Sequence, residues 1–295
     1  MPELPNKLLE AIRTKKCVLF AGAGLSRGSI QENGEGKEID LPTWDGLLVE
    51  LLNRARSLDY VSVNEAGKLR KAVKEGKYLF VAQTIRHVLG ARAFDDTLEA
   101  IFRNSELKPT RRHYLIAQIP FIAIVTTNYD KLLESAYAAQ GYVPPTYTYR
   151  DAPDVIAALS HQKFFILKAH GDIDRKDTII LSEKDYRDIL YREPGYRAAL
   201  NTIFITKTVF FVGASLSDVD VKLILESVSE SFSGRGPVHY ALVPWGDASD
   251  SEVIHWRDFF GIHLIRYKAT KDHPEVDNFL TQLRDAVVPA GALNA

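Results

Sequence analysis

Short apolar runs recur along the chain, and each is bounded by glycine, aspartate or serine. Runs of this length and composition are typical of strands that are buried on both faces of a sheet. The pattern predicts six such strands, at Cys17–Ala21, Phe121–Val125, Phe164–Lys168, Thr208–Val212, Val238–Val243 and His263–Tyr267.

Longer segments between these runs carry apolar residues three and four positions apart, which is the spacing of an amphipathic helix. They are Asp130–Gln140, Asp218–Phe232, Asp250–Phe260 and Glu275–Val287. Because strand and helix alternate, we expect an α/β fold with a Rossmann-like parallel sheet and helices on both of its faces.

A long stretch between the first two strands breaks this alternation. Helical spacing covers most of it, at Thr43–Arg56, Asn64–Glu75, Tyr78–Leu89 and Phe94–Arg103. We therefore predict a helical insertion after the first strand, at about residues 43–105, within a single domain of residues 1–290. Two segments without periodicity are expected to be flexible, the polar loop 27–42 beside the first strand and the tail 291–295.

Composition narrows the classes of partner. The 295 residues are 46% hydrophobic and 25% charged, which is typical of a soluble globular protein. The 37 basic residues face 38 acidic ones, so the chain lacks the overall positive field that holds a phosphate backbone, and nucleic acid is not expected as a direct partner. The local pair Arg111 and Arg112 is interpreted as part of a solvated helix face.

Cys17 is the only cysteine, which rules out an internal disulfide and any zinc site built from two or more cysteines. Its place in an apolar run predicts an inert, buried thiol. The sequence starts without a secretory leader, and no apolar run approaches the roughly 18 residues of a membrane span, so we expect a cytoplasmic protein that does not enter a membrane.

Candidate chemistry begins at the end of the first predicted strand. In the segment Phe20–Ser26, the apolar run is followed directly by Gly22 and Gly24 and then by the hydroxyl of Ser26. A turn of this kind lets backbone N–H groups approach a diphosphate, because glycine has no Cβ to hold the ligand away. The spacing is neither G-x-G-x-x-G nor a P-loop, so a tight turn without a ligand stays open as an alternative.

Three more strand ends carry small or polar groups, at Val125–Asp130, Leu167–Asp172 and Phe211–Asp218. Asp130 lies two residues after the amide of Asn128. It could belong to a ligand site or could cap the next helix. His170 could act as a base near neutral pH, although a lone histidine is usually structural. The carboxyl ends of parallel strands meet at one edge of a sheet, so we expect the four segments to outline one cleft.

The four segments resemble the NAD-binding motifs of sirtuins in order and rough spacing. The matching residues are Gly22–Ser26, Thr127–Asp130, His170–Gly171 and Gly213–Leu216. The resemblance extends from about residue 17 to residue 232.

Three segments resemble in particular the bacterial sirtuin-like branch found in antiphage defence. They are Thr126–Asp130, Lys168–Asp172 and Ser182–Tyr186. Two features of deacylating sirtuins are absent, namely the four-cysteine zinc ribbon, since residues 171–212 contain no cysteine, and the Gly-Ile-Pro-Asp-Phe-Arg stretch. Val219 stands where bacterial relatives often have proline. The absence of the zinc ribbon and of the Gly-Ile-Pro-Asp-Phe-Arg stretch argues against acyl-lysine chemistry.

The resemblance implies an NAD glycohydrolase that cleaves NAD to nicotinamide and ADP-ribose as an antiphage effector, with NAD as its substrate and no metal. Asn128 would hold the ribose hydroxyls or the attacking water, and His170 would accept a proton. The implied NAD-binding residues are Gly22, Ala23, Gly24, Ser26, Thr127, Asp130, Gly213 and Ser215.

Two alternatives to NAD hydrolysis stay open. One is NAD-dependent protein deacylation or ADP-ribosyl transfer, and the other is a nucleotide-sensing module without catalysis. Control is expected to come from other chains, because the catalytic fold uses almost all of the sequence. We expect a homo-oligomer, and the resemblance implies a partner ATPase of the HerA type.

Overall fold

A computed structural model describes residues 2–27, 41–103, 107–216, 222, 225–226 and 236–288. The predicted loop 27–42 and the predicted helix 218–232 fall largely outside the described residues, and Val219 and the tail 291–295 fall outside them entirely.

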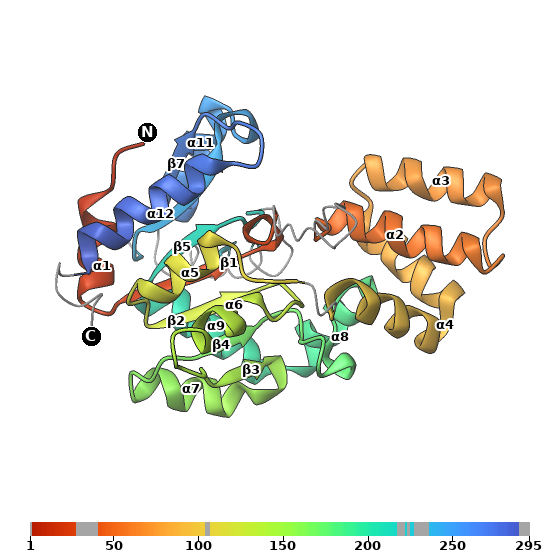
Figure 1. The fold of residues 1–295 in the computed structure, drawn as a ribbon, viewed down its shortest axis with the longest axis horizontal. Coiled ribbons are helices and arrows are strands. Elements are labelled where there is room, and N and C mark those ends of the chain that lie inside the picture. Colours follow the sequence, from red (N-terminus) through yellow and green to blue (C-terminus); the bar gives the residue numbers. More distant parts are fainter. Residues whose placement is uncertain are drawn as a thin grey trace.

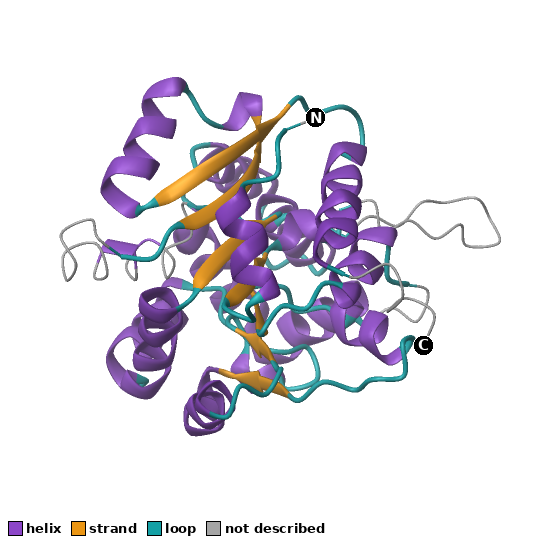
Figure 2. Ribbon diagram, turned by 90° about the vertical axis from the view of Figure 1, so that its left-hand side faces the viewer, coloured by secondary structure: helices purple, strands orange, loops and turns teal. Residues whose placement is uncertain are grey.

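Within these described residues, seven strands form one sheet in the order β3-β4-β2-β1-β5-β6-β7, and every neighbouring pair is parallel (Figures 1 and 2). The predicted α/β fold with a parallel sheet is confirmed, and the six predicted strands are all present. The short edge strand β3 was not predicted. The strands are β1 Cys17–Ala21, β2 Ala123–Thr126, β3 Thr146–Thr148, β4 Ile166–Lys168, β5 Thr208–Val212, β6 His239–Pro244 and β7 Ile262–Tyr267.

Helices connect the strands and cover both faces of the sheet (Figure 2). The α-helices are α1 Asn6–Arg13, α2 Trp44–Ser57, α3 Val63–Lys74, α4 Tyr78–Phe102, α5 Arg111–Gln118, α6 Leu132–Ala138, α7 Ala152–Ser160, α8 Glu183–Arg192, α9 Pro194–Thr206, α11 Asp250–Phe260 and α12 Pro274–Val287. The short 3₁₀ helices of the described part are η1 Ala23–Leu25, η2 Tyr149–Asp151, η3 Lys176–Thr178 and η4 Trp245–Asp247.

Alternate residues of each strand point into two separate cores. In β1, Val18 and Phe20 belong to the core that contains α7 and α9. Cys17, Leu19 and Ala21 belong to the core that contains α1, α5 and α12. The sheet is therefore buried on both faces, which is why its strands are continuous apolar runs. The buried position predicted for Cys17 is confirmed, and burial raises the pKa of its thiol.

Helices α2, α3 and α4 pack around a third core of their own, beyond the carboxyl ends of the strands (Figure 1). Tyr129 and Ile173, which follow β2 and β4, contribute to this core. The predicted helices Tyr78–Leu89 and Phe94–Arg103 are the two arms of α4, which kinks at Gly90. The helical segment thus adjoins the edge of the sheet where the candidate residues collect.

The interpretation of Arg112 as part of a solvated helix face is wrong, because its side chain is buried. Its Nε donates to Asp277 at 3.0 Å, and its terminal nitrogens donate to the backbone carbonyls of Arg27, Asp272 and His273. A guanidinium offers five donors, so one carboxylate and several carbonyls can satisfy it inside the protein. Arg112 consequently fastens α5 to the start of α12.

Candidate active site

The four candidate segments follow four adjacent strands of the sheet. Their order is β4, β2, β1 and β5. The last residues of these strands pair across the sheet, Lys168 with Thr126, Thr126 with Ala21, and Ala21 with Val212. His170, Asn128, Gly22 and Gly213 therefore all lie at one edge. Strand order reverses beside β1, and open α/β sheets bind ligands in this position.

Ser26 lies at the centre of a buried hydrogen-bonded cluster at this edge. Its Oγ lies 3.0 Å from Asp130 Oδ2 and 3.1 Å from Asn128 Nδ2. A carboxylate can only accept, so the Ser26 hydroxyl donates its proton to Asp130. The same oxygen then accepts from the amide of Asn128, which fixes the orientation of that amide.

The fixed amide leaves Asn128 Oδ1 as an open acceptor. Asn128 is 7% exposed, and among the residues that the structure describes its Oδ1 has no hydrogen-bond partner. A buried polar atom without a partner costs about 1–3 kcal/mol. A site that retains such an atom is suited to a ligand that donates a hydrogen bond there.

His113 joins the cluster from α5, and the sequence analysis did not identify it. The N–H of Thr110 donates to His113 Nδ1 at 3.2 Å, so the ring proton sits on Nε2. That Nε2 faces Ser26 Oγ at 3.5 Å. Burial, with the charge of Arg112 adding to it, lowers the pKa of His113 to about 3, which keeps the ring neutral. The only signal in the sequence is the spacing Thr110-x-x-His113, which forms a capping box.

Asp130 serves two purposes at once. Its Oδ2 accepts from Ser26, while its Oδ1 accepts from the backbone N–H of Leu132 at 3.0 Å, in the first turn of α6. Asp130 is thus not the N-cap of α6, which is Lys131, but from the preceding position its carboxylate accepts the first N–H of the helix and also belongs to the polar cluster.

His170 is buried at the end of β4, and its ring lies edge-on to the ring of Tyr186 from α8. The Tyr186 hydroxyl is 3.3 Å from His170 Nε2. Gly171 follows with φ of 96°, and a Cβ there would lie 2.1 Å from the carbonyl oxygen of Thr178. Glycine is thus required for the turn that carries the imidazole.

The glycines after β1 and β5 pack against each other. A Cβ on Gly22 would lie 2.5 Å from Ala214 Cα, and one on Gly213 would lie 2.2 Å from the backbone nitrogen of Leu25. Gly24 N–H donates to Gly213 O at 2.8 Å. Close packing of two turns is therefore a sufficient reason for these glycines, in addition to the expected approach of a diphosphate.

The remaining predicted residues occupy less constrained positions. Ala23 is half-buried in η1, and the half-buried Thr127 donates its N–H to Ala21 O at 3.1 Å. Ser215 is exposed beyond the end of β5. The structure thus joins Ser26, Asn128 and Asp130 directly and places the other predicted residues along the same edge.

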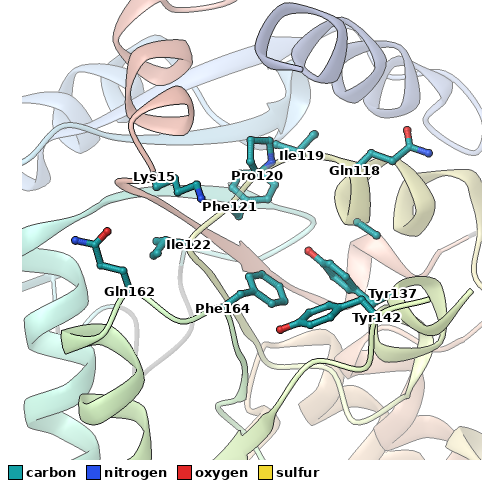
Figure 3. A pocket seen from close by; sticks show the side chains of 11 residues that line it. Lys15, Gln118, Ile119, Pro120, Phe121, Ile122, Tyr137, Tyr142, Gln162 and Phe164 are labelled. Carbon is teal, nitrogen blue, oxygen red and sulfur yellow. The ribbon is translucent and has the colours of Figure 1, made fainter. Parts of the chain in front are cut away.

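Among the described residues, two cavities are lined by residues other than those of this cluster. One of about 350 Å³ is lined by aromatic side chains, including Tyr137, Tyr142 and Phe164 (Figure 3). Its other lining residues, such as Lys15 and Ile122, precede strands, so it lies at the opposite edge of the sheet. The second, of about 290 Å³, is lined by charged side chains of η2, α4 and α8.

In the described ranges, no three or more histidine, cysteine, aspartate or glutamate side chains gather closely enough to hold a metal ion. Across the same part of the chain, no helix has both the length and the apolar character needed to cross a bilayer.

Comparison with known proteins finds a family model that matches part of the chain. Residues 122–265 match the family model described as SIR2-like domain. The matched region runs from the start of β2 into β7 and contains Asn128, His170 and Gly213.

Curated relatives match over most of the chain. Defense-associated sirtuin 2 of Bacillus subtilis is 28% identical over 77% of this chain and 20% of its own length. The NAD(+) hydrolase ThsA of Cytobacillus dafuensis is 26% identical over 80% of the chain and 43% of its own length. The ThsA of Enterococcus faecium is 24% identical over 93% and 52%. The chain spans about half or less of the length of these relatives.

Proposed function

We propose that the chain hydrolyses NAD at the bond between nicotinamide and ribose. The observation that carries this proposal is the open Oδ1 of Asn128, held at the edge of the sheet by Ser26 and Asp130. Ribose hydroxyls and water both donate hydrogen bonds, and either would satisfy this buried oxygen. Similarity to proteins named NAD(+) hydrolase supports the choice of NAD as the nucleotide.

Hydrolysis at this bond needs two things from the protein. Breaking the bond between C1′ and the nicotinamide nitrogen leaves positive charge on the ribose, and the electron pair departs with nicotinamide. The oxygen of water then bonds to C1′, and one of its protons must be accepted. Asn128 Oδ1 would orient the ribose hydroxyl or the water, and His170 would accept the proton and pass it to solvent.

Binding of the rest of NAD would use the neighbouring turns. The backbone of Gly22, Ala23 and Gly24 would approach the diphosphate, and Gly213 and Ser215 would lie near the adenosine ribose. Thr127 and Asp130 would line the nicotinamide side. The Ser26 hydroxyl is already bound to Asp130 and Asn128, so its contacts favour a role in positioning Asn128 over contact with the diphosphate.

The proposal extends to the biological setting. Residues 1–290 would form one NAD-binding domain, with the helical segment of about residues 43–105 as an insertion. The protein would act in the cytoplasm as an antiphage effector that depletes NAD. Similarity to a protein named defense-associated sirtuin supports this role. Control would come from a homo-oligomer and from a partner such as an ATPase of the HerA type.

Substitution of the two central residues tests the assignment. In purified protein, Asn128→Ala and His170→Ala should each lower nicotinamide release from NAD by about two orders of magnitude. Asn64→Ala and His161→Ala change the same residue types at exposed positions and serve as matched controls. Wild-type rates for both site variants would show that the reaction takes place elsewhere.

A further inference from the structure

A lysine that no step above uses lies fully buried beneath the candidate site. Lys168 is the last residue of β4 and is 1% exposed. Its Nζ donates to the backbone carbonyl of Asp130. The same nitrogen lies 3.3 Å from Glu134 Oε1, whose side chain is 13% exposed.

A contribution to stability alone does not readily explain why Lys168 and Glu134 form a buried ion pair. Removing an ammonium and a carboxylate from water costs several kcal/mol per ion, and their mutual attraction often fails to exceed that cost. Within the described residues, Glu134 Oε2 lacks a hydrogen-bond partner, so the pair is not fully satisfied. Well-packed apolar side chains of similar volume would commonly serve stability equally well.

The position of Lys168 between the two catalytic strand ends offers another explanation for its burial. Asp130, whose carbonyl the ammonium holds, is two residues after Asn128, and Lys168 itself is two residues before His170. Lys168 therefore connects the two strand ends that carry the proposed catalytic groups.

A neighbouring lysine extends the connection. Lys131 lies 3.1 Å from Glu134 Oε1 and 2.8 Å from Asp172 Oδ2, at the turn after His170. Burial acts to raise the pKa of Asp172, but the charges of Lys168 and Lys131 outweigh it and lower that pKa. The two lysines and their carboxylates thus form one network between β2, β4 and α6.

We propose that Lys168 is a positioning residue for NAD cleavage, setting the relative placement of Asn128 and His170 through the Asp130 carbonyl. The inference rests on the proposed function. The ammonium is buried among protein groups, so its proposed role is to hold other residues in place and not to bind the substrate. Its loss should therefore lower kcat more than it changes KM, because displacement of catalytic groups by about 1 Å can slow a reaction about 100-fold.

Stability and positioning can be separated with a pair of substitutions. Lys168→Met removes the buried partner of Glu134 and leaves it with the partly exposed Lys131, so both stability and kcat should fall. Lys168→Met combined with Glu134→Leu removes both buried charges and should recover much of the free energy of unfolding. The double variant still lacks the donor to Asp130, so its kcat should stay about 10- to 100-fold below that of the wild type.

The experiment measures kcat and KM for NAD and the free energy of unfolding for the full chain and each variant. Lys68→Met is the matched control, because Lys68 also pairs with a carboxylate, Glu65, but at an exposed position on α3 outside this network; it should keep the wild-type kcat. Lys168→Gln retains a neutral donor of shorter reach, and its lowered kcat with little change in KM gives a test that does not depend on the double variant folding.

The outcomes separate the two proposals. A double variant with recovered stability and lowered kcat supports the positioning role. A folded double variant, or a folded Lys168→Met variant, with the wild-type kcat overturns that role while NAD hydrolysis stands. A wild-type chain that cleaves no NAD overturns the proposed function itself.

Discussion

At the scale of single residues, the candidate site depends on the direction in which one amide points. The Ser26 hydroxyl donates a hydrogen bond to Asp130 and accepts one from Asn128 Nδ2, which leaves Asn128 Oδ1 outside that contact. Thr110 fixes the tautomer of His113 in the same manner, so that its Nε2–H faces Ser26. The Ser26 hydroxyl therefore contacts the side chains of Asn128, Asp130 and His113.

Removal of that hydroxyl should disturb catalysis more than binding. In Ser26→Ala the Asn128 amide loses a hydrogen bond worth about 1 kcal/mol and is free to turn, so kcat should fall about tenfold. Steady-state kinetics with NAD measure the change, and Ser57→Ala at an exposed helical position is the control. An unchanged kcat in Ser26→Ala would show that Ser26 does not position the Asn128 amide for catalysis.

The buried neutral histidines predict how stability depends on pH. Burial lowers the pKa of His113 to about 3 and that of His239 to about 4, whereas a histidine in the unfolded chain titrates near 6.5. As the pH falls below about 6.5, the unfolded chain binds protons that the folded chain does not. Stability should therefore decrease, by up to about 1.4 kcal/mol per pH unit for each ring.

Chemical denaturation at pH values from 8 to 5 measures this decrease. In His113→Gln the slope below pH 6.5 should be smaller than in the wild type, and in His161→Gln, at an exposed position, it should be the same as in the wild type. Equal slopes in all three proteins would mean that His113 is not held neutral by the fold.

The site positions of residues that follow strand ends were predictable from the sequence. The positions of residues that other helices contribute were not. Asn128, Asp130 and Ser26 follow apolar runs, so parallel-sheet geometry alone brings them together. His113 enters from α5, ahead of the strand that carries Asn128, and its role depends on tertiary packing. Arg112 was misinterpreted for the same reason, because its carboxylate partner is on α12.

At the scale of elements, the site is built from turns that follow strands and from the helical segment beside them. Tyr129, next to Asn128, packs edge-on against Phe102 of α4, with ring centres 5.3 Å apart. Its hydroxyl donates to Ile180 O at 2.6 Å. Changes in the packing of α4 should therefore reach the turn that carries Asn128.

The kink in α4 offers a test of what shapes this helix. Gly90 has φ of 70° and ψ of 168°, a conformation essentially restricted to glycine, and a Cβ there would meet no atom within 4 Å. Gly90→Ala should destabilise the protein by about 1–3 kcal/mol through backbone strain alone. Denaturation midpoints measure the effect.

Gly67 in α3 provides the matched control, because a Cβ there also meets nothing within 4 Å and its backbone is helical. Gly67→Ala should stabilise by about 0.5–1 kcal/mol. If both substitutions had the same sign, the conformation at Gly90 would not be the source of the kink.

Elements were predictable where the chain is buried on both sides or strongly periodic. The six predicted strands lie in mainly apolar runs and are all present. Strand β3 has the sequence Thr-Tyr-Thr and two of its three residues are half-buried, so no apolar run marks it. The break between the two arms of α4 was anticipated because helical spacing stops before Gly90 and resumes at Phe94.

At the scale of the whole molecule, one parallel sheet carries the candidate site at one edge and an aromatic-lined cavity at the other. The helical segment α2–α4 lies on the site's side (Figure 1). Its own core includes residues from the turns after β2 and β4, so the segment and the site are parts of one packed unit.

The central claim is that this edge of the sheet cleaves the bond between nicotinamide and ribose. The most direct measurement is a mass-spectrometric analysis of the products formed from NAD by the purified wild-type chain and by Asn128→Ala, with a chelator present. We predict nicotinamide and ADP-ribose in equal amounts from the wild type, and at least about 100-fold less from the variant. Nicotinamide mononucleotide and AMP as products, or equal product from the two proteins, would contradict the claim.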